Sequence, residues 1–214
     1  MQFPSTPVGA VKRVAILDTE TTGLSVLSEA IIELALVVVD IDTATGLPVG
    51  EVQVFDGFDD PQRPIPPEIQ ALTGITDDMV AGQRLDLLAI NQIMKGVDWV
   101  VAHNAAFDRQ WFGCGELPIL EKAWICSMED IRWPAERQLR TTPSVRDLAL
   151  AYGVPVWAAH RALTDCIYLA QVFERCPELE LLLQAGLEPR RLYRARLSYE
   201  ERHKAREAGF RWNE

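Results

Sequence analysis

Long apolar runs separated by turn residues dominate the first quarter of the chain. Residues 11–17 and 30–41 are mostly apolar, and residues 50–58 alternate between apolar and polar positions. The turn sequences TTGLS and TATGLPVG separate these runs. Apolar runs bounded by Gly, Thr and Pro predict strands. Three strands joined by such short connections favour an antiparallel meander.

Most of the remaining chain has helical periodicity. Leu85, Leu88, Ile93 and Val97 recur near a spacing of 3.6, which predicts a helix over residues 84–97. The sequence DWVVAH predicts a short buried strand at residues 98–103. Further helices are expected at residues 66–76, 104–114, 144–154 and 160–176. The pattern predicts an α/β fold in which a mixed central sheet is flanked by helices.

The composition is that of a globular protein. The chain has 214 residues, of which 48% are hydrophobic and 24% charged, so it can form one sizeable domain. It contains no apolar stretch long enough to span a membrane and no recognisable secretory signal. The four cysteines lack C-x-x-C spacing and fit reduced thiols. We therefore expect a cytoplasmic protein without a membrane partner.

The charge is unevenly distributed. The net charge of −10 argues against a protein that coats duplex nucleic acid. Residues 189–212 nevertheless carry eight Lys and Arg against three Glu, so a local charge of +5 leaves −15 for the rest. This segment could contact a polyanion, or it could be an ordinary solvated helix. We divide the chain into a domain of residues 1–186 and a basic C-terminal extension of residues 187–214.

Four carboxylates stand at positions where they could meet. Asp18 and Glu20 are two residues apart at the end of the first apolar run, so in a strand they face the same side. Asp108 follows the strand predicted at residues 98–103, and Asp165 lies beside the apolar stripe of the last long helix. Each acid alone has an ordinary explanation, as a turn residue or as a solvated helix residue.

Convergence of these acids would require cations. Carboxylates about 4 Å apart repel by roughly 4 kcal/mol per pair at an effective dielectric constant near 20. An all-oxygen site suits Mg²⁺ or Mn²⁺ better than Zn²⁺. His160 is five residues before Asp165, so both can reach one site only if His160 precedes the helix or lies in its first turn.

Three segments resemble the exonuclease motifs of the DEDDh family in the family's order. They are LDTETTGL, AHNAAFDRQ and HRALTD, and the likeness covers roughly residues 12–176. This family includes the epsilon proofreading subunit of bacterial DNA polymerase III and ribonuclease T. The resemblance implies a ribonuclease H-like fold and 3′→5′ hydrolysis of nucleic acid with two divalent cations, Mg²⁺ or Mn²⁺.

The resemblance also implies roles for individual residues. Asp18, Glu20, Asp108 and Asp165 match the metal-binding acids, and His160 matches the general base. The positions expected to bind the terminal nucleotide are Thr19, Gly23, Leu24, His103, Asn104 and Phe107, with Leu24 as an apolar wedge. Cys166 stands where the family more often has Ala. The extension weakly resembles a short motif appended to some of these exonucleases, and we expect it to be an incomplete nucleic-acid-binding element.

Several alternatives stay open at this point. The substrate expected from DTETTGL is a DNA 3′ end, and the alternative is the 3′ end of RNA, as for ribonuclease T. A non-catalytic nucleic-acid-binding module is a further alternative, although such a module would normally lack one of the acids or the His. A polymerase or repair partner would fit the DNA-acting branch. The sequence does not indicate the oligomeric state.

Overall fold

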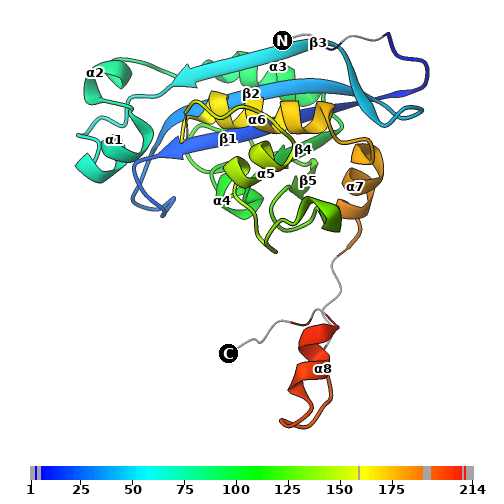
Figure 1. Cartoon of the computed structure of the whole chain (residues 1–214). Coiled ribbons are helices and arrows are strands. Elements are labelled where there is room, and N and C mark those ends of the chain that lie inside the picture. The colour runs from blue at the N-terminus through cyan, green and yellow to red at the C-terminus, as the bar shows by residue number, and fades with distance from the viewer. Residues whose placement is uncertain (1–2, 4–5, 159, 190–193, 209, 211–214) are drawn as a thin grey trace.

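The centre of the fold is a five-stranded mixed sheet with strand order β3-β2-β1-β4-β5 (Figure 1). The computed structural model describes residues 3, 6–158, 160–189, 194–208 and 210. The strands are β1 (Val11–Thr21), β2 (Ile31–Asp42), β3 (Leu47–Phe58), β4 (Trp99–Ala102) and β5 (Ala123–Cys126). The first three pair antiparallel, and β4 and β5 are added in parallel. The predicted α/β class and mixed sheet are confirmed.

Helices follow the meander and then cover the sheet. The segment after β3 forms α1 (Pro67–Thr73), α2 (Asp77–Val80) and α3 (Leu87–Lys95), and α4 (Ala105–Arg109) follows β4. After β5 come a 3₁₀ turn (Ala135–Arg137), α5 (Val145–Ala151), α6 (Ala162–Glu174) and α7 (Leu179–Gly186). Gly74 ends α1 with a left-handed φ of 71°, a conformation that suits Gly.

Alternation along β1 divides its side chains between two apolar layers. Val14 and Ile16 pack in the layer that contains α5, α6 and α7, whereas Ala15 and Leu17 pack in the layer that contains α3. Because strand side chains alternate, Asp18 and Glu20 continue the row of Val14 and Ile16. Both acids therefore face the side of the sheet on which α6 lies.

Helix α6 lies across β1 and β2 (Figure 1). Its buried residues place it against the sheet and include Ala162, Cys166, Leu169, Ala170 and Phe173. Asp165 precedes Cys166 and is only partly buried, as expected at the margin of this stripe. The packing of α6 thus brings the end of the helix that bears Asp165 over the end of β1.

Some predicted boundaries are wrong. The helix expected at residues 104–114 ends as an α-helix at Arg109 and continues as turns, and the helix expected at 84–97 is limited to α3. Strand β5 and helix α7 were not predicted. β5 is four residues long and contains the partly exposed Trp124, so its sequence lacks a clear strand pattern.

The described part of the C-terminal extension contains one short helix, α8 (Arg202–Glu207), which buries none of its side chains. Figure 1 shows α8 apart from the sheet and its helices. Several residues of the predicted basic extension lie outside the described residues: Arg190, Arg191, Tyr193, Arg211 and Trp212. Within the described ranges, no helix is both long enough and apolar enough to cross a membrane.

Candidate functional site

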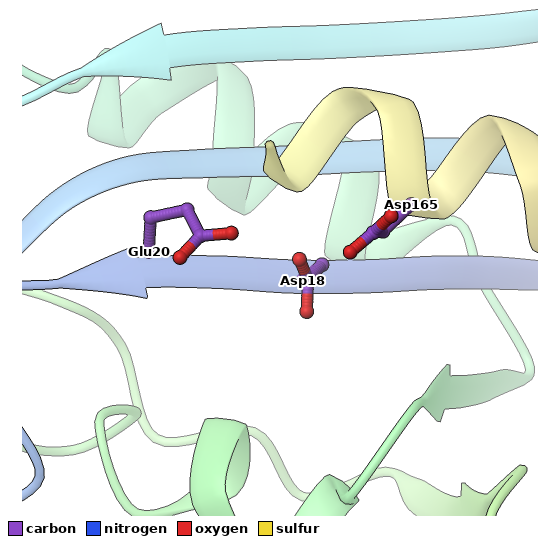
Figure 2. Close-up of side chains that lie close together, drawn as sticks. All are labelled: Asp18, Glu20 and Asp165. Carbon is purple, nitrogen blue, oxygen red and sulfur yellow. The ribbon is translucent and has the colours of Figure 1, made fainter. Parts of the chain in front are cut away.

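Three of the four predicted acids form a cluster between β1 and α6. Asp18, Glu20 and Asp165 each offer a carboxylate oxygen, and these oxygens lie within 4.8 Å of one another. Figure 2 shows the two β1 side chains and the α6 side chain turned toward a common point. The two-residue spacing on a strand and the packing of α6 account for the cluster, which we call the acidic cluster below.

The acidic cluster favours protonation unless positive charge is supplied. Burial, followed by the charges of Asp108, Glu20, Asp165 and Glu33, raises the pKa of Asp18 well above its ordinary value. Burial and the charge of Asp165 raise the pKa of Glu20 to about 8. Burial raises the pKa of Asp165 to about 6, and the charge of His160 lowers it. At neutral pH Glu20 is therefore mostly protonated unless a cation lies beside the acidic cluster.

Asp108 is next to the acidic cluster but is not a member of it. Its side chain is 1% exposed, and its Oδ1 accepts a hydrogen bond of 2.8 Å from Thr19 Oγ1. Among the described residues, its Oδ2 is buried without a hydrogen-bond partner. Burial raises the pKa of Asp108 to about 7. A buried carboxylate oxygen that lacks a donor is a position where a cation would satisfy the group.

His160 lies immediately before α6, as the spacing to Asp165 required. Its side chain is exposed, and its backbone has a left-handed φ of 56°, which non-glycine residues rarely adopt. The charge and the backbone N–H of His160 both act to lower the pKa of Asp165, so His160 is near that carboxylate. His160 is thus held beside the acidic cluster with its imidazole accessible to solvent.

The loop after β1 carries the predicted wedge and is fixed by polar contacts. Leu24 is 81% exposed, as a residue that meets a ligand would be. Thr22 Oγ1 donates to Glu29 (2.7 Å), and Arg63 Nη2 donates to both Thr22 (3.0 Å) and Glu29 (2.8 Å). A Cβ at Gly23 would lie 2.9 Å from Glu29 Cγ, so this position must stay small while Glu29 keeps its contacts.

The three candidates from the second motif differ in exposure. His103 lines a small cavity together with Asp18 and Asp165, and its Nδ1 is 2.9 Å from Ser127 Oγ. Burial lowers the pKa of His103 to about 4, so the ring is neutral at physiological pH. Asn104 is exposed with a left-handed φ of 64°, and its side chain caps no helix. Phe107 packs edge to face against Trp111.

Thr19, also predicted to contact the terminal nucleotide, is buried and its hydroxyl is already paired. It is 5% exposed, and its hydroxyl is used on Asp108. This position follows from β1, in which Thr19 alternates with Asp18 and Glu20 and projects to the other side of the strand. The hydroxyl of Thr19 therefore orients Asp108, and its contact with a terminal nucleotide stays a prediction.

Sequence reasoning missed two residues at this site, Glu33 and Arg161. Glu33 is wholly buried in β2 and binds the Arg161 guanidinium at 2.8 Å. One signal was available, because Glu33 is the only charged residue in the run IIELALVVV. A charged residue in a strand buried on both faces indicates a specific partner.

A protein-family model matches most of this chain, including the residues of the site. The model described as Exonuclease (RNase_T) matches residues 15–173, a range that contains the acidic cluster, Asp108 and His160. The chain belongs to this exonuclease family. A second model, described as a domain of unknown function, matches residues 191–214 within the basic extension.

The curated relatives of this exonuclease include proteins named as DNA polymerase III subunits and as DNA exonucleases. The DNA polymerase III epsilon subunit of Treponema pallidum (strain Nichols) is 31% identical over 167 residues, which are 73% of this chain and 72% of that protein. Exodeoxyribonuclease 10 of Escherichia coli (strain K12) is 34% identical over 160 residues, 72% of this chain and 64% of that protein. A PolC-type DNA polymerase III of Bacillus subtilis (strain 168) is 39% identical, but the match spans only 7% of its length.

Solved structures agree with the assignment. Exonuclease X in complex with 5′ overhanging duplex DNA is 32% identical, with a TM-score of 0.54, and the match covers 74% of this chain and 87% of that chain. An E. coli ExoI–ssDNA complex is 19% identical, with a TM-score of 0.57, covering 81% of this chain and 43% of that chain. The second likeness shows the shared ribonuclease H-like fold alone.

The donor set of the exonuclease fits divalent metal ions. The acidic cluster offers carboxylate oxygens only, and the unpaired Oδ2 of Asp108 adds another. Hard oxygen ligands suit Mg²⁺ and Mn²⁺, whereas Zn²⁺ sites usually include His or Cys. Positive charge at this point would also offset the burial and the repulsion that raise the pKa of Asp18 and Glu20.

The metal-free exonuclease is expected to lose stability as pH rises from about 6 to about 8. In this window the folded state retains protons on Asp165, Asp108 and Glu20, whereas carboxyl groups of an unfolded chain ionise near pH 4. The folded state then binds more protons, so the free energy of unfolding falls with rising pH. Thermal melting in EDTA at pH 6, 7 and 8 measures this decline.

Two controls sharpen the melting experiment. Mg²⁺ is expected to raise the melting temperature most at pH 8, and Glu20→Gln is expected to flatten the pH dependence in EDTA. Burial of neutral His103 opposes this decline up to about pH 6.5, so the interval from pH 7 to pH 8 reports the acids with little contribution from His103. A melting temperature in EDTA that rises over this last interval would contradict the proposed electrostatics.

Proposed function

We propose that this chain is a two-metal-ion 3′→5′ exonuclease that acts on single-stranded or frayed DNA 3′ ends and releases nucleoside 5′-monophosphates. The observation that carries the proposal is the acidic cluster with His160 beside it at the start of α6. The cluster consists of carboxylates alone, and their raised pKa values are typical of a functional site.

The residues that would hold the cations are Asp18, Glu20, Asp108 and Asp165. The bound ions would supply Lewis-acid stabilisation of the charge that develops on the scissile phosphate. Thr19 fixes the orientation of Asp108 through its hydroxyl. The position of Asp165 in α6, opposite β1, lets the two elements present their carboxylates from different directions.

His160 has the position of a general base. A water oxygen forms a bond to the phosphorus of the terminal phosphodiester, and the imidazole of His160 accepts a proton of that water. The bond from phosphorus to the 3′ oxygen of the preceding nucleotide breaks, and this oxygen takes a proton from solvent to become the new 3′-OH. General-base catalysis by a side chain contributes about 10²- to 10⁴-fold. Exposure of the ring allows this proton to leave to solvent afterwards.

The loop with Leu24 is the proposed contact for the terminal nucleotide. An exposed leucine on a loop fixed by Thr22, Glu29 and Arg63 can pack against a base without losing much conformational entropy. Gly23, His103, Asn104 and Phe107 are proposed to complete this pocket. A pocket that takes one unpaired base favours single-stranded or frayed ends.

DNA is the proposed substrate because two relatives that match about 70% of this chain are named as a DNA polymerase III subunit and as an exodeoxyribonuclease. The same names support a polymerase or repair complex as the partner. RNA is the alternative substrate, and discrimination between the two would depend on contacts to the 2′-OH. A non-catalytic module is disfavoured because all four acids and the His are present.

The decisive experiment is digestion of matched single-stranded DNA and RNA labelled at the 5′ end. The expected result is a ladder that shortens from the 3′ end in Mg²⁺, faster for DNA, with nucleoside 5′-monophosphates as the released product. EDTA is expected to stop the reaction. Faster digestion of RNA would establish the alternative substrate, and no Mg²⁺-dependent release from either would refute an active nuclease.

Removal of residues 189–214 is expected to raise KM for long single strands and to weaken the salt dependence of binding. The extension is basic whereas the domain is acidic, and Arg and Lys that neutralise phosphates release counterions. Tyr199 is 69% exposed and can stack on an unpaired base for roughly 1–3 kcal/mol. Turnover of a dinucleotide should barely change, because a dinucleotide cannot reach the extension.

The control for the truncation is a full-length variant with three charges removed from α8: Arg202→Gln, Lys204→Gln and Arg206→Gln. It should reproduce much of the rise in KM. If the truncated protein instead melts much lower and loses activity equally on short and long substrates, the extension stabilises the domain and does not bind the strand.

A further inference from the structure

Glu33 is a wholly buried acid that the proposed chemistry does not use. It lies in β2 directly opposite Glu20 of β1, and its exposed fraction is 0%. Its neighbours Ile32 and Leu34 are equally buried. A carboxylate in such a place is costly unless every oxygen is paired, so its contacts indicate why this position is Glu.

Both carboxylate oxygens of Glu33 accept hydrogen bonds from the two residues that follow His160. Arg161 Nε lies 3.1 Å from Oε1 and 3.2 Å from Oε2, and Arg161 Nη2 donates to Oε1 at 2.8 Å. The backbone N–H of Ala162, the first residue of α6, donates to Oε2 at 2.8 Å. Arg161 occupies the N-cap position, but its side chain does not cap the helix. The carboxylate of Glu33, which comes from β2, instead accepts the first free N–H of α6.

The segment before His160 is fixed by a second contact. Tyr168 Oη, in α6, accepts hydrogen bonds from Trp157 N (2.7 Å) and Ala158 N (2.9 Å), and it donates to Ala158 O (2.8 Å). His160 therefore lies between two attachment points, one to Tyr168 and one to Glu33. Its left-handed backbone, which is unfavourable for His, requires such support from its surroundings.

We propose that Glu33 is a positioning residue: by holding Arg161 and the first N–H of α6, it fixes the backbone of His160 and so directs the imidazole toward the acidic cluster. The inference rests on the proposed function, in which His160 is the general base. A bidentate Arg–carboxylate pair has defined geometry, which a single ionic contact lacks. The Cζ atom of Arg161 also lies over the ring of Phe58, 5.5 Å from its centroid.

A double-mutant cycle separates positioning from simple stabilisation. Glu33→Gln keeps the size of the side chain and an acceptor for Ala162 N–H, but it removes the charge that orders Arg161. In the wild-type background, Glu33→Gln is expected to lower kcat about 10- to 100-fold, with KM within about threefold. In a His160→Ala background it should change kcat by less than about threefold, because the residue it positions is absent. Equal losses in both backgrounds would overturn the proposal.

Amide hydrogen exchange gives a readout that does not depend on activity. In metal-free protein, Glu33→Gln is expected to speed exchange at least tenfold at the backbone N–H of Ala162, which donates to Glu33, while the amides of β1 keep their protection. Unchanged exchange at Ala162 would overturn the proposal. If Glu33→Gln does not fold, Arg161→Lys takes its place in both experiments, because it keeps the charge beside Glu33 but loses the bidentate geometry.

A destabilising variant remote from the site serves as the control. Leu183 is buried in α7, so Leu183→Ala should lower the melting temperature but leave the exchange at Ala162 and the cycle with His160→Ala unaffected. Failure of the proposed function can be told apart from failure of this inference. A wild-type protein that releases no nucleotide would refute the nuclease, and the exchange experiment would still decide whether Glu33 holds the segment that contains His160.

Discussion

Replacement of Asp18 by alanine is expected to lower the single-turnover rate of nucleotide release by roughly 10⁴-fold or more, as for residues that act as a unit. Asp18 is the carboxylate whose charge interacts with Asp108, Glu20 and Asp165 together. Its loss would remove one ligand of the cations, and the displacement needs these cations in place. Glu20→Ala, Asp108→Ala and Asp165→Ala are expected to have similar effects.

The same variant should not be destabilised in EDTA. Removing Asp18 relieves repulsion within the acidic cluster, so the melting temperature should stay constant or rise. Asp78→Ala is a matched control, because Asp78 is an exposed acid in α2 that should leave the rate unchanged. Activity of Asp18→Ala within tenfold of wild type would refute the site assignment.

Replacement of His160 by alanine is expected to lower kcat by about 10²- to 10⁴-fold, less than loss of an acid. The variant should still bind a 3′ end and Mg²⁺, because the acidic cluster remains complete. It should also lose the rise of the rate with pH that a general base causes. Initial rates across pH, with binding measured separately by fluorescence anisotropy in Ca²⁺, check both statements.

His203→Ala supplies the matched control for this variant. His203 is exposed in α8, far along the chain from the acidic cluster, and its substitution should leave kcat unchanged. If His160→Ala keeps both the rate and the pH profile of wild type, another group accepts the proton.

The features that the sequence predicted are those determined by local pattern. Two-residue spacing placed Asp18 and Glu20 on one side of a strand, and the five-residue separation from Asp165 required His160 to precede α6. Both statements need only strand and helix geometry. The meander was predictable for the same reason, because its strands are long apolar runs with clear turns between them.

The remaining features depend on contacts between distant segments. Glu33 and Arg161 are 128 residues apart, and Thr19 and Asp108 are 89 apart, so no spacing rule joins them. Leu88 fits the helical period of α3 yet is 76% exposed, because the burial of α3 depends on Ile90, Ile93 and Met94 instead. β5 is too short and too mixed to be distinguished from a loop.

The position of Asp165 in α6 has a consequence for the protein during its synthesis. Both β1 acids leave the ribosome early, but the helix that covers the same side of the sheet and supplies Asp165 is among the last elements of the domain. A nascent chain that ends before α6 would have an uncovered apolar layer and an incomplete set of acids. Nuclease activity would therefore begin only when the domain is almost wholly translated and folded, which protects nucleic acid near the ribosome from a partly made enzyme.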